Sequence, residues 1–134
     1  MRCFIDTNIL ISAGLFPTSV PAAALEKALT PPNVAIICDY SLDEMQRVIN
    51  RKFPHKAHDL ETFLYRLLFS VVRVPTPVDI HATEAEIRDV KDRPLLRAAI
   101  QSCADIMITG DKDFLESAIT NPKISTAAQF LNRE

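Results

Sequence analysis

The chain has 134 residues, of which 48% are hydrophobic, and a formal net charge of −2. This length suits a single domain spanning residues 1–134, and a domain of this size buries roughly two-thirds of the surface that its unfolded chain exposes. The slight negative charge excludes a globally basic nucleic-acid-binding protein, so contact with nucleic acid would need a local basic patch.

The N-terminal part of the sequence alternates β-prone runs with helical patterns. Residues 2–6 predict a strand, and a helix is expected to begin near Thr7 or Asn8. A second helix is predicted at 19–29, where a proline occupies the first turn. The continuous apolar run at 34–38 is typical of a strand that is buried on both faces.

The middle of the sequence predicts two helices and a strand. Residues 41–53 form a helical pattern in which Ser41 and Glu44 have the spacing of a capping box. Residues 59–70 carry apolar side chains at helical spacing, which indicates a helix with one face in the core. A third strand is expected at 71–75.

The remaining elements continue the alternation. Residues 78–88 predict a helix with a weaker pattern, and 92–103 predict a helix with a proline near its start. A fourth strand is expected at 105–109. A fifth strand at 123–125 and a final helix at 126–134 complete the pattern.

Strands that alternate with helices predict a parallel sheet covered on both faces and joined by right-handed crossovers. The expected fold is therefore a three-layer α/β/α arrangement around a central, mostly parallel sheet of four or five strands. In such sheets, ligands bind beyond the carboxyl ends of the strands. Side chains that follow the strands are accordingly the first candidates for a functional site.

The cysteines and the hydropathy pattern indicate a reducing, aqueous compartment. Cys3, Cys38 and Cys103 lie far apart in apolar contexts, so we expect reduced, buried thiols and neither a disulfide nor a zinc site. No segment approaches the roughly 18 apolar residues of a membrane span, and the N-terminus lacks the pattern of a signal peptide. We therefore expect a cytoplasmic protein with no membrane partner.

Acidic residues lie at the ends of several predicted strands or at the starts of the adjoining helices. Asp6 ends the first strand, Glu44 lies in the first turn of the helix after the second strand, and Asp92 opens the helix before the fourth strand. Asp111 and Asp113 follow that fourth strand. Because all of these places are assigned to one edge of a parallel sheet, we expect the carboxylates to converge.

Converging carboxylates repel one another, so they must take up protons or bind a cation. Two carboxylates ~4 Å apart cost about 4 kcal/mol at an effective dielectric constant of 20. Oxygen ligands without histidine or cysteine suit Mg²⁺ or Mn²⁺ and disfavour zinc. These ions assist phosphodiester cleavage by polarising a phosphoryl oxygen and activating water, so the set predicts metal-dependent chemistry on nucleic acid.

A structural explanation exists for each acid taken alone, because Asp commonly caps a helix and contributes about 1 kcal/mol. Asp92 precedes a helix, Glu44 can complete a capping box, and Asp113 has the capping-box spacing to Glu116. Caps do not require acids at all of these strand ends, however. The complete set is therefore more informative than any of its members and favours a metal site.

Three motifs resemble those of PIN domains, and the resemblance covers nearly the whole chain. They are FIDTNILISAG at the first strand, SLDEMQRVI in the following acidic helix, and DVKDRPLLRAAIQSCADIMITGDKDFL around the fourth strand. The resemblance implies metal binding and catalysis by four residues, Asp6, Glu44, Asp92 and Asp111. It also implies supporting polar roles for Asn8, Thr109 and Asp113. The spacing DVKD leaves Asp89 as a residue that could share or replace the role of Asp92.

The same resemblance implies a ribonuclease selective for single-stranded RNA, closest to the VapC-type toxins of bacterial and archaeal toxin–antitoxin pairs. Such proteins typically form homodimers and are silenced by a cognate antitoxin whose peptide enters the acidic groove. Some family members serve as scaffolds, so a non-catalytic binding module is the alternative. An aspartyl-nucleophile phosphatase is a weaker alternative, because that chemistry usually needs a second acid where this chain has Asn8.

Basic residues follow or flank the acidic positions. Among them, Arg47 and Arg93 are the candidates for contacts with RNA phosphates along the rim of the groove. The alternative is that both are solvated residues on exposed helix faces. An acidic cleft cannot attract a polynucleotide unaided, so a metal ion and local arginines would have to reverse its sign.

Overall fold

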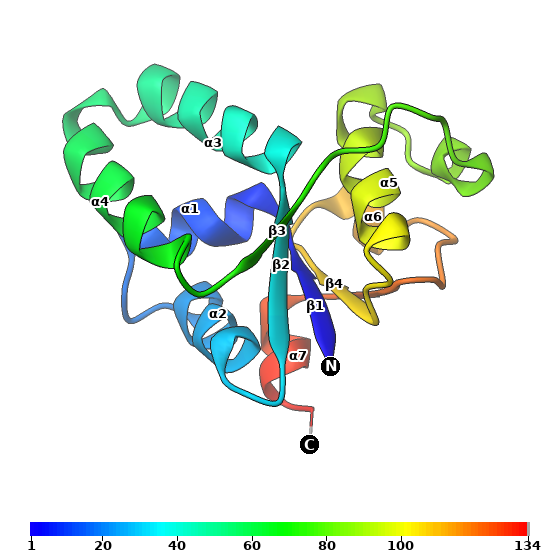
Figure 1. The fold of residues 1–134 in the computed structure, drawn as a ribbon, viewed down its shortest axis with the longest axis horizontal. Helices are drawn as coiled ribbons and strands as arrows, with labels where there is room; N and C mark the ends of the chain where they lie inside the picture. The colour runs from blue at the N-terminus through cyan, green and yellow to red at the C-terminus, as the bar shows by residue number, and fades with distance from the viewer. Residues whose placement is uncertain (134) are drawn as a thin grey trace.

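The central sheet has five parallel strands in the order β3-β2-β1-β4-β5 (Figure 1). The structure is a computed structural model, and it describes residues 1–133. The parallel sheet is confirmed, and so is the fifth strand. The strands are β1 (Arg2–Ile5), β2 (Val34–Cys38), β3 (Val72–Val74), β4 (Ile106–Ile108) and β5 (Lys123–Ser125).

The helices occupy the connections between these strands. They are α1 (Thr7–Leu15), α2 (Val20–Leu29), α3 (Asp39–Lys52), α4 (Ala57–Leu67), α5 (Arg93–Gln101), α6 (Lys112–Leu115) and α7 (Ala127–Leu131). Residue 134, which we expected at the end of the last helix, lies outside the described residues. Within residues 1–133 no single helix is long and apolar enough to cross a membrane. Helices α1 and α2 together reach the length and hydropathy of a span, but the chain bends by 111° between them.

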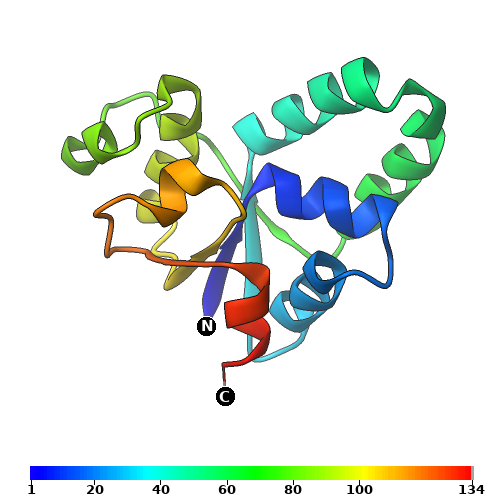
Figure 2. The ribbon, with the colours of Figure 1, turned by 180° about the vertical axis from the view of Figure 1, so that it is seen from behind.

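Two hydrophobic clusters pack on opposite faces of the sheet. On β1, Cys3 and Ile5 belong to the cluster formed with α1, α2, α3, α4 and α7, whereas Phe4 belongs to the cluster formed with α5 and α6. Figures 1 and 2 show α1–α4 on one side of the sheet and α5 and α6 on the other. The three-layer α/β/α fold is therefore confirmed.

The strand order places a topological switch point between β1 and β4. From β1 the chain moves to β2 and β3 on one side, and it later returns to β4 on the other side of β1. Open parallel sheets bind ligands in the crevice outside the carboxyl ends of strands at such a point. In register terms, Ile5 pairs with Ile108, so the residues that follow these two strands emerge next to each other.

The helix predicted at 78–88 is wrong. The structure has an irregular segment there, followed by a short 3₁₀ helix, η2 (Ala82–Glu86). Within the predicted range, Glu84 turns to the distant Arg97, with which it forms an ion pair, and the chain keeps only this short 3₁₀ helix. A second 3₁₀ helix, η3 (Val90–Asp92), leads into α5.

The start predicted for the third helix is also wrong. Helix α3 begins at Asp39, so Glu44 lies in its second turn and not in its first. Ser41 is buried, and its hydroxyl lies 3.4 Å from the Cys38 sulfur. The capping box expected for Ser41 and Glu44 therefore does not form, and Glu44 is left without that structural role.

Cys103 departs from the expectation of buried thiols. Cys3 and Cys38 are buried, but Cys103 is exposed and has a φ of 57°, in the left-handed region. It follows the C-terminus of α5, where its amide donates to the Ile100 carbonyl and the Ala104 amide donates to the Ala99 carbonyl, both at 3.0 Å. These two bonds form a Schellman motif, whose left-handed position is normally filled by glycine.

The variant Cys103→Gly is therefore expected to stabilise the protein by about 0.5–1 kcal/mol, because glycine adopts this backbone conformation without steric cost. The measurement is chemical denaturation under reducing conditions. Cys103→Ala is the matched control, since it removes the thiol and keeps a β-carbon. If both variants unfold at the same denaturant concentration as the wild type, the left-handed residue carries no strain.

Candidate functional site

Asp6 follows β1 at the switch point and is almost completely buried, with 3% of its surface exposed. The Thr109 hydroxyl, which follows β4, donates a hydrogen bond of 2.6 Å to the Asp6 carboxylate. The Asp6 amide also donates to the Ile108 carbonyl at 3.0 Å. The pairing of β1 with β4 thus fixes the position and orientation of this carboxylate.

The surroundings of Asp6 disfavour its negative charge. Burial raises the pKa of the Asp6 carboxyl to about 6, against the opposing effect of the Thr109 hydrogen bond. The negative charges of Glu44 and Asp111 contribute to the same rise in pKa. The charges of Glu44 and Asp111 therefore reach the Asp6 carboxyl.

Asp92 occupies the N-cap position of α5, but its side chain makes no capping hydrogen bond. The cap explanation therefore does not account for this acid. Burial and the adjacent Asp111 carboxylate raise the pKa of Asp92 to about 8, with further contributions from Asp89 and Asp6. Asp92 is thus held next to other carboxylates without a hydrogen bond that stabilises its charged form within the described part of the chain.

Asp111 does act as a cap. Its carboxylate accepts the Asp113 amide at 2.9 Å at the start of α6, and its own amide donates to the Thr109 hydroxyl at 3.0 Å. Asp113 instead forms an ion pair with Arg88 at 2.9 Å, and Arg88 also contacts Glu116 at 2.9 Å. The capping box expected for Asp113 and Glu116 is therefore absent, and Arg88 bridges the two acids.

A group of three carboxylates lies at the edge of this region. Oxygen atoms of Asp89, Asp92 and Asp113 all lie within 4.8 Å of one another. Asp89 is exposed, and its carboxylate accepts the Lys91 amide at 3.0 Å as the cap of η3. Asp92 is thus the shared member, lying in this group and beside Asp111 and Asp6.

The structure places the other predicted residues as follows. Glu44 is half-buried on α3, and its charge acts on Asp6, whereas Asn8 is exposed in the first turn of α1. Arg93 is partly buried, and its Nε donates to the Ile87 carbonyl at 3.0 Å. Arg47 is exposed and lies with its guanidinium 5.9 Å from the centre of the Tyr40 ring.

Tyr40 is a residue at this site that the sequence did not single out. Its hydroxyl donates to the Lys91 carbonyl at 2.7 Å, and its amide donates to the Thr76 hydroxyl at 3.0 Å. Burial, followed by the charge of Glu44, raises the pKa of the Tyr40 phenol, so the group stays a donor. An aromatic residue two positions after a buried strand was the available signal. Tyr40 joins α3 to the segment that carries Asp89 and Asp92.

The donor set fits a hard divalent cation. The converging side chains offer carboxylate oxygens, which are the ligands that Mg²⁺ and Mn²⁺ prefer. Within residues 1–133, Arg88 is the cation that forms an ion pair with a member of this group, and that member is Asp113. The hydroxyl of Thr7, next to Asp6, is buried without a hydrogen-bond partner among the same residues.

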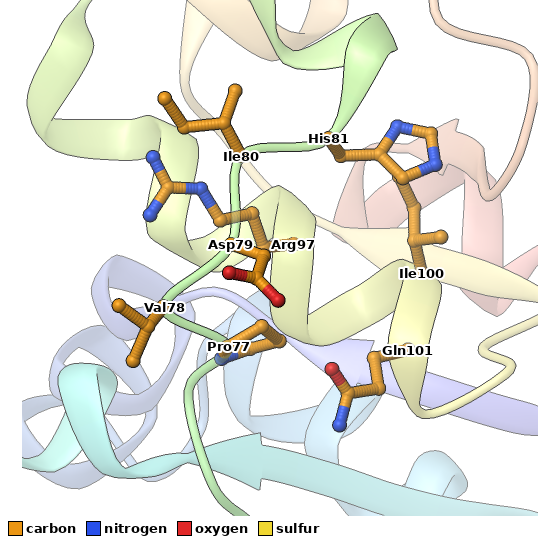
Figure 3. Close-up of a pocket in the computed structure, with 8 residues that line it drawn as sticks. All are labelled: Pro77, Val78, Asp79, Ile80, His81, Arg97, Ile100 and Gln101. Atoms are coloured by element: carbon orange, nitrogen blue, oxygen red, sulfur yellow. The ribbon is translucent and has the colours of Figure 1, made fainter.

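A separate cavity of ≈ 440 Å³ lies between residues 77–81 and α5 (Figure 3). The segment runs alongside the helix, and α5 contributes Arg97, Ile100 and Gln101 to the lining of the cavity. Arg97 is held there by a buried ion pair with Glu84 of η2. Asp79 is the carboxylate among its lining residues, and the converging acids lie outside this cavity.

Solved structures that are similar to this fold include the following three. VapBC2 from Rickettsia felis, bound to a DNA fragment from its promoter, is 18% identical with a TM-score of 0.71, covering 94% of this chain and 98% of that chain. VapC20 from Mycobacterium tuberculosis, a toxin that cleaves the sarcin–ricin loop, is 17% identical with a TM-score of 0.60, covering 85% and 93%. FitAcB from Neisseria gonorrhoeae is 15% identical with a TM-score of 0.57, covering 92% and 95%.

At these identities the structural likeness concerns the fold. No curated protein matches the sequence. A family model described as PIN domain, however, matches residues 2–113, a range that includes Asp6, Glu44, Asp92 and Asp111. This match extends over most of the chain and agrees with the fold and with the motifs from which the resemblance was inferred. The chain therefore belongs to the PIN-domain family.

Proposed function

We propose that this protein is a metal-dependent endoribonuclease that cleaves phosphodiester bonds of single-stranded RNA, acting through one nuclease domain over residues 1–134. The observation that carries the proposal is the buried Asp6 beside Asp92, each with a pKa raised by burial and by neighbouring carboxylates. In the absence of a cation, such a group either keeps protons or holds charges that repel. A fold without a use for a cation would have no reason to keep them together.

The proposed metal ligands are Asp6, Glu44, Asp92 and Asp111, and they would hold Mg²⁺ or Mn²⁺. When bound there, the ion would polarise a phosphoryl oxygen and lower the pKa of water. The Thr109 hydroxyl donates a hydrogen bond to the Asp6 carboxylate, and it accepts a hydrogen bond from the Asp111 amide. The Asp111 carboxylate is held separately, by the Asp113 amide, so both carboxylates are fixed before substrate arrives, which lowers the cost of organising the site.

Other side chains have supporting roles in the proposal. Asp113 and Asp89 adjust the charge next to Asp92, and Asn8 offers a polar side chain at the start of α1. Arg47 would contact a phosphate of the RNA from the exposed face of α3. Arg93 has one guanidinium nitrogen committed to the Ile87 carbonyl, so its contact with RNA would use the others.

The biological role proposed is that of a cytoplasmic toxin with a cognate antitoxin. The fold is similar to that of VapC20, a toxin that cleaves the sarcin–ricin loop, and to that of VapBC2. An antitoxin peptide that enters the acidic groove would block RNA and metal together. A homodimer belongs to the same proposal, and exposed apolar side chains such as Tyr65 and Phe69 on and after α4 offer surface for association.

Cleavage of a labelled single-stranded oligoribonucleotide is expected to require Mg²⁺ or Mn²⁺, to stop in EDTA, and to return when the ion is added in excess. The physical reason is that the carboxylates alone would repel the phosphodiester. The Asp6→Asn protein, purified in parallel, controls for contaminating nuclease. The metal mechanism would be contradicted if the wild type cleaved equally well in EDTA while the Asp6→Asn preparation did not cleave. No cleavage under any condition would favour a non-catalytic binding module.

A further inference from the structure

A second cavity opens directly beside the carboxylates. Its volume is ≈ 350 Å³, and it is lined by Tyr40, Glu44, Arg47, Val48, Arg51 and Lys91. Glu44 belongs to both the cavity and the proposed metal site, so the two share a wall. Lys91 comes from η3, which also carries Asp92. Whatever occupies this cavity therefore lies next to the proposed reacting centre.

Helical spacing places the basic residues of α3 in a line that leads away from the acids. Glu44, Arg47 and Arg51 occupy positions i, i+3 and i+7 and share one face of the helix. At 1.5 Å per residue, Arg51 lies about 10 Å beyond Glu44 along the helix axis. The face thus changes from negative to positive within two turns, and the positive end lines the cavity.

The cations of this cavity are free to bind an anion. Arg47, Arg51 and Lys91 are exposed, and none has a carboxylate oxygen within 4.0 Å among residues 1–133. The arginines at 73, 88 and 97, in contrast, all form ion pairs. Three cations face a single cavity carboxylate, that of Glu44. This local balance is opposite in sign to the neighbouring acidic group.

Tyr40 organises the cavity before any ligand is bound. Its hydroxyl is tied to the Lys91 carbonyl at 2.7 Å, which joins the α3 wall to the η3 wall. Its ring faces the Arg47 guanidinium at 5.9 Å, within the range of a cation–π interaction. Side chains held in place lose less conformational freedom on binding.

We infer that this cavity is a phosphate subsite, in which Arg47, Arg51 and Lys91 bind a backbone phosphate of single-stranded RNA next to the phosphodiester that is cleaved. This inference rests on the proposed function, and it extends it by naming a binding site outside the carboxylates. The subsite supplies the positive charge that the acidic region lacks, so it holds the strand in register with the proposed metal site. Arg51 and Lys91 are positioning residues in this scheme.

The test measures binding of a fluorescein-labelled oligouridylate without added metal, in EDTA, so that binding is separated from cleavage. Arg51→Gln and Lys91→Gln are each expected to weaken binding about tenfold. Each should also reduce the slope of log affinity against log salt by about 0.7, the value for one phosphate contact with a single strand. Lys52→Gln is the matched control, because it makes the same charge change one residue from Arg51 and outside the cavity.

The outcomes separate this inference from the proposed function. Weaker binding by the cavity variants, without metal-dependent cleavage by the wild type, supports the subsite and rejects the nuclease. Cleavage with an unchanged KM in both cavity variants supports the nuclease and overturns the subsite. The subsite is also overturned if the wild type does not bind the oligonucleotide, if Lys52→Gln has an equal effect, or if an octaglutamate peptide competes as well as unlabelled RNA.

Discussion

Replacing Asp6 or Asp111 by asparagine is expected to lower RNA turnover by more than about a hundredfold, which is the upper range for residues that only support a metal ligand. Both variants should stay folded. Asparagine keeps an oxygen that can accept the Thr109 hydroxyl at position 6 and the Asp113 amide at position 111. Only the charge is removed, and at position 6 that charge is disfavoured by burial.

The measurement is cleavage of a labelled oligoribonucleotide in Mn²⁺, with a thermal melt of each variant to confirm folding. Asp43→Asn is the control, because it makes the same charge change at an exposed position next to Glu44 in the chain. The control should retain wild-type turnover. If Asp6→Asn also retains it, Asp6 does not carry the chemistry, and the proposed assignment of the site is wrong.

The same assay distinguishes Asp89 from Asp92 as the third ligand. Asp89 is exposed and already caps η3, and asparagine can keep that hydrogen bond to the Lys91 amide. Asp92 is half-buried and makes no capping bond, so removing its charge breaks no hydrogen bond that caps α5. We expect Asp92→Asn to be inactive and Asp89→Asn to keep most of its turnover. The reverse result would move the ligand to Asp89.

The fold was largely predictable because local patterns of apolar residues indicate most of its strands and helices. The apolar run that became β2 is buried from Ala35 to Cys38, as expected for a central strand covered on both faces. The alternation of strands and helices then left a parallel sheet as the simplest arrangement. Strand order is a different matter, since the insertion of β1 between β2 and β4 depends on pairings that are distant in sequence.

The region from 75 to 92 shows where local patterns fail. A helix at 78–88 would have placed Val78, Ile80 and Ile87 on apolar faces, but Val78 is 90% exposed, Ile80 is 77% exposed and Ile87 is fully buried. What holds the segment is a buried ion pair from Glu84 to Arg97, thirteen positions away. Such a pairing leaves no signature in local hydrophobic periodicity.

The candidate site was predictable in outline because the carboxyl ends of parallel strands share one edge of the sheet. The charges of Glu44 and Asp111 act on Asp6, and those of Asp111 and Asp6 act on Asp92. The carboxylates that lie within 4.8 Å of one another are those of Asp89, Asp92 and Asp113. Three capping explanations were plausible from spacing alone and failed. Asp92 makes no capping bond, Ser41 and Glu44 form no capping box, and Arg88 binds Asp113. Side-chain directions and non-local partners decided these cases.

Replacing Asp92 by asparagine is expected to stabilise the metal-free protein at neutral pH. The pKa of this carboxyl is about 8 in the folded protein and has an ordinary value of 3.8. As the pH rises above about 4, the unfolded chain loses this proton while the folded protein keeps it, so stability falls until the pH reaches about 8. Because Asp92 is only half-buried, solvent screening reduces the expected gain at pH 7.5 to about 1–2 kcal/mol.

Manganese should reverse the order of the two proteins. An ion that binds only the folded state stabilises it by about 2.7 kcal/mol at a hundredfold excess over Kd, and Asp92→Asn should gain less because it lacks one ligand. Four thermal melts at pH 7.5, of wild type and variant with and without Mn²⁺, give the comparison, and Asp43→Asn should follow the wild type in both. A second set at pH 5 should show a smaller difference in stability between the two metal-free proteins, since the raised pKa of Asp92 destabilises the wild type less at that pH. If the wild type gains nothing from Mn²⁺ and Asp92→Asn is no more stable than wild type, the converging acids are structural, and the nuclease proposal loses its physical basis.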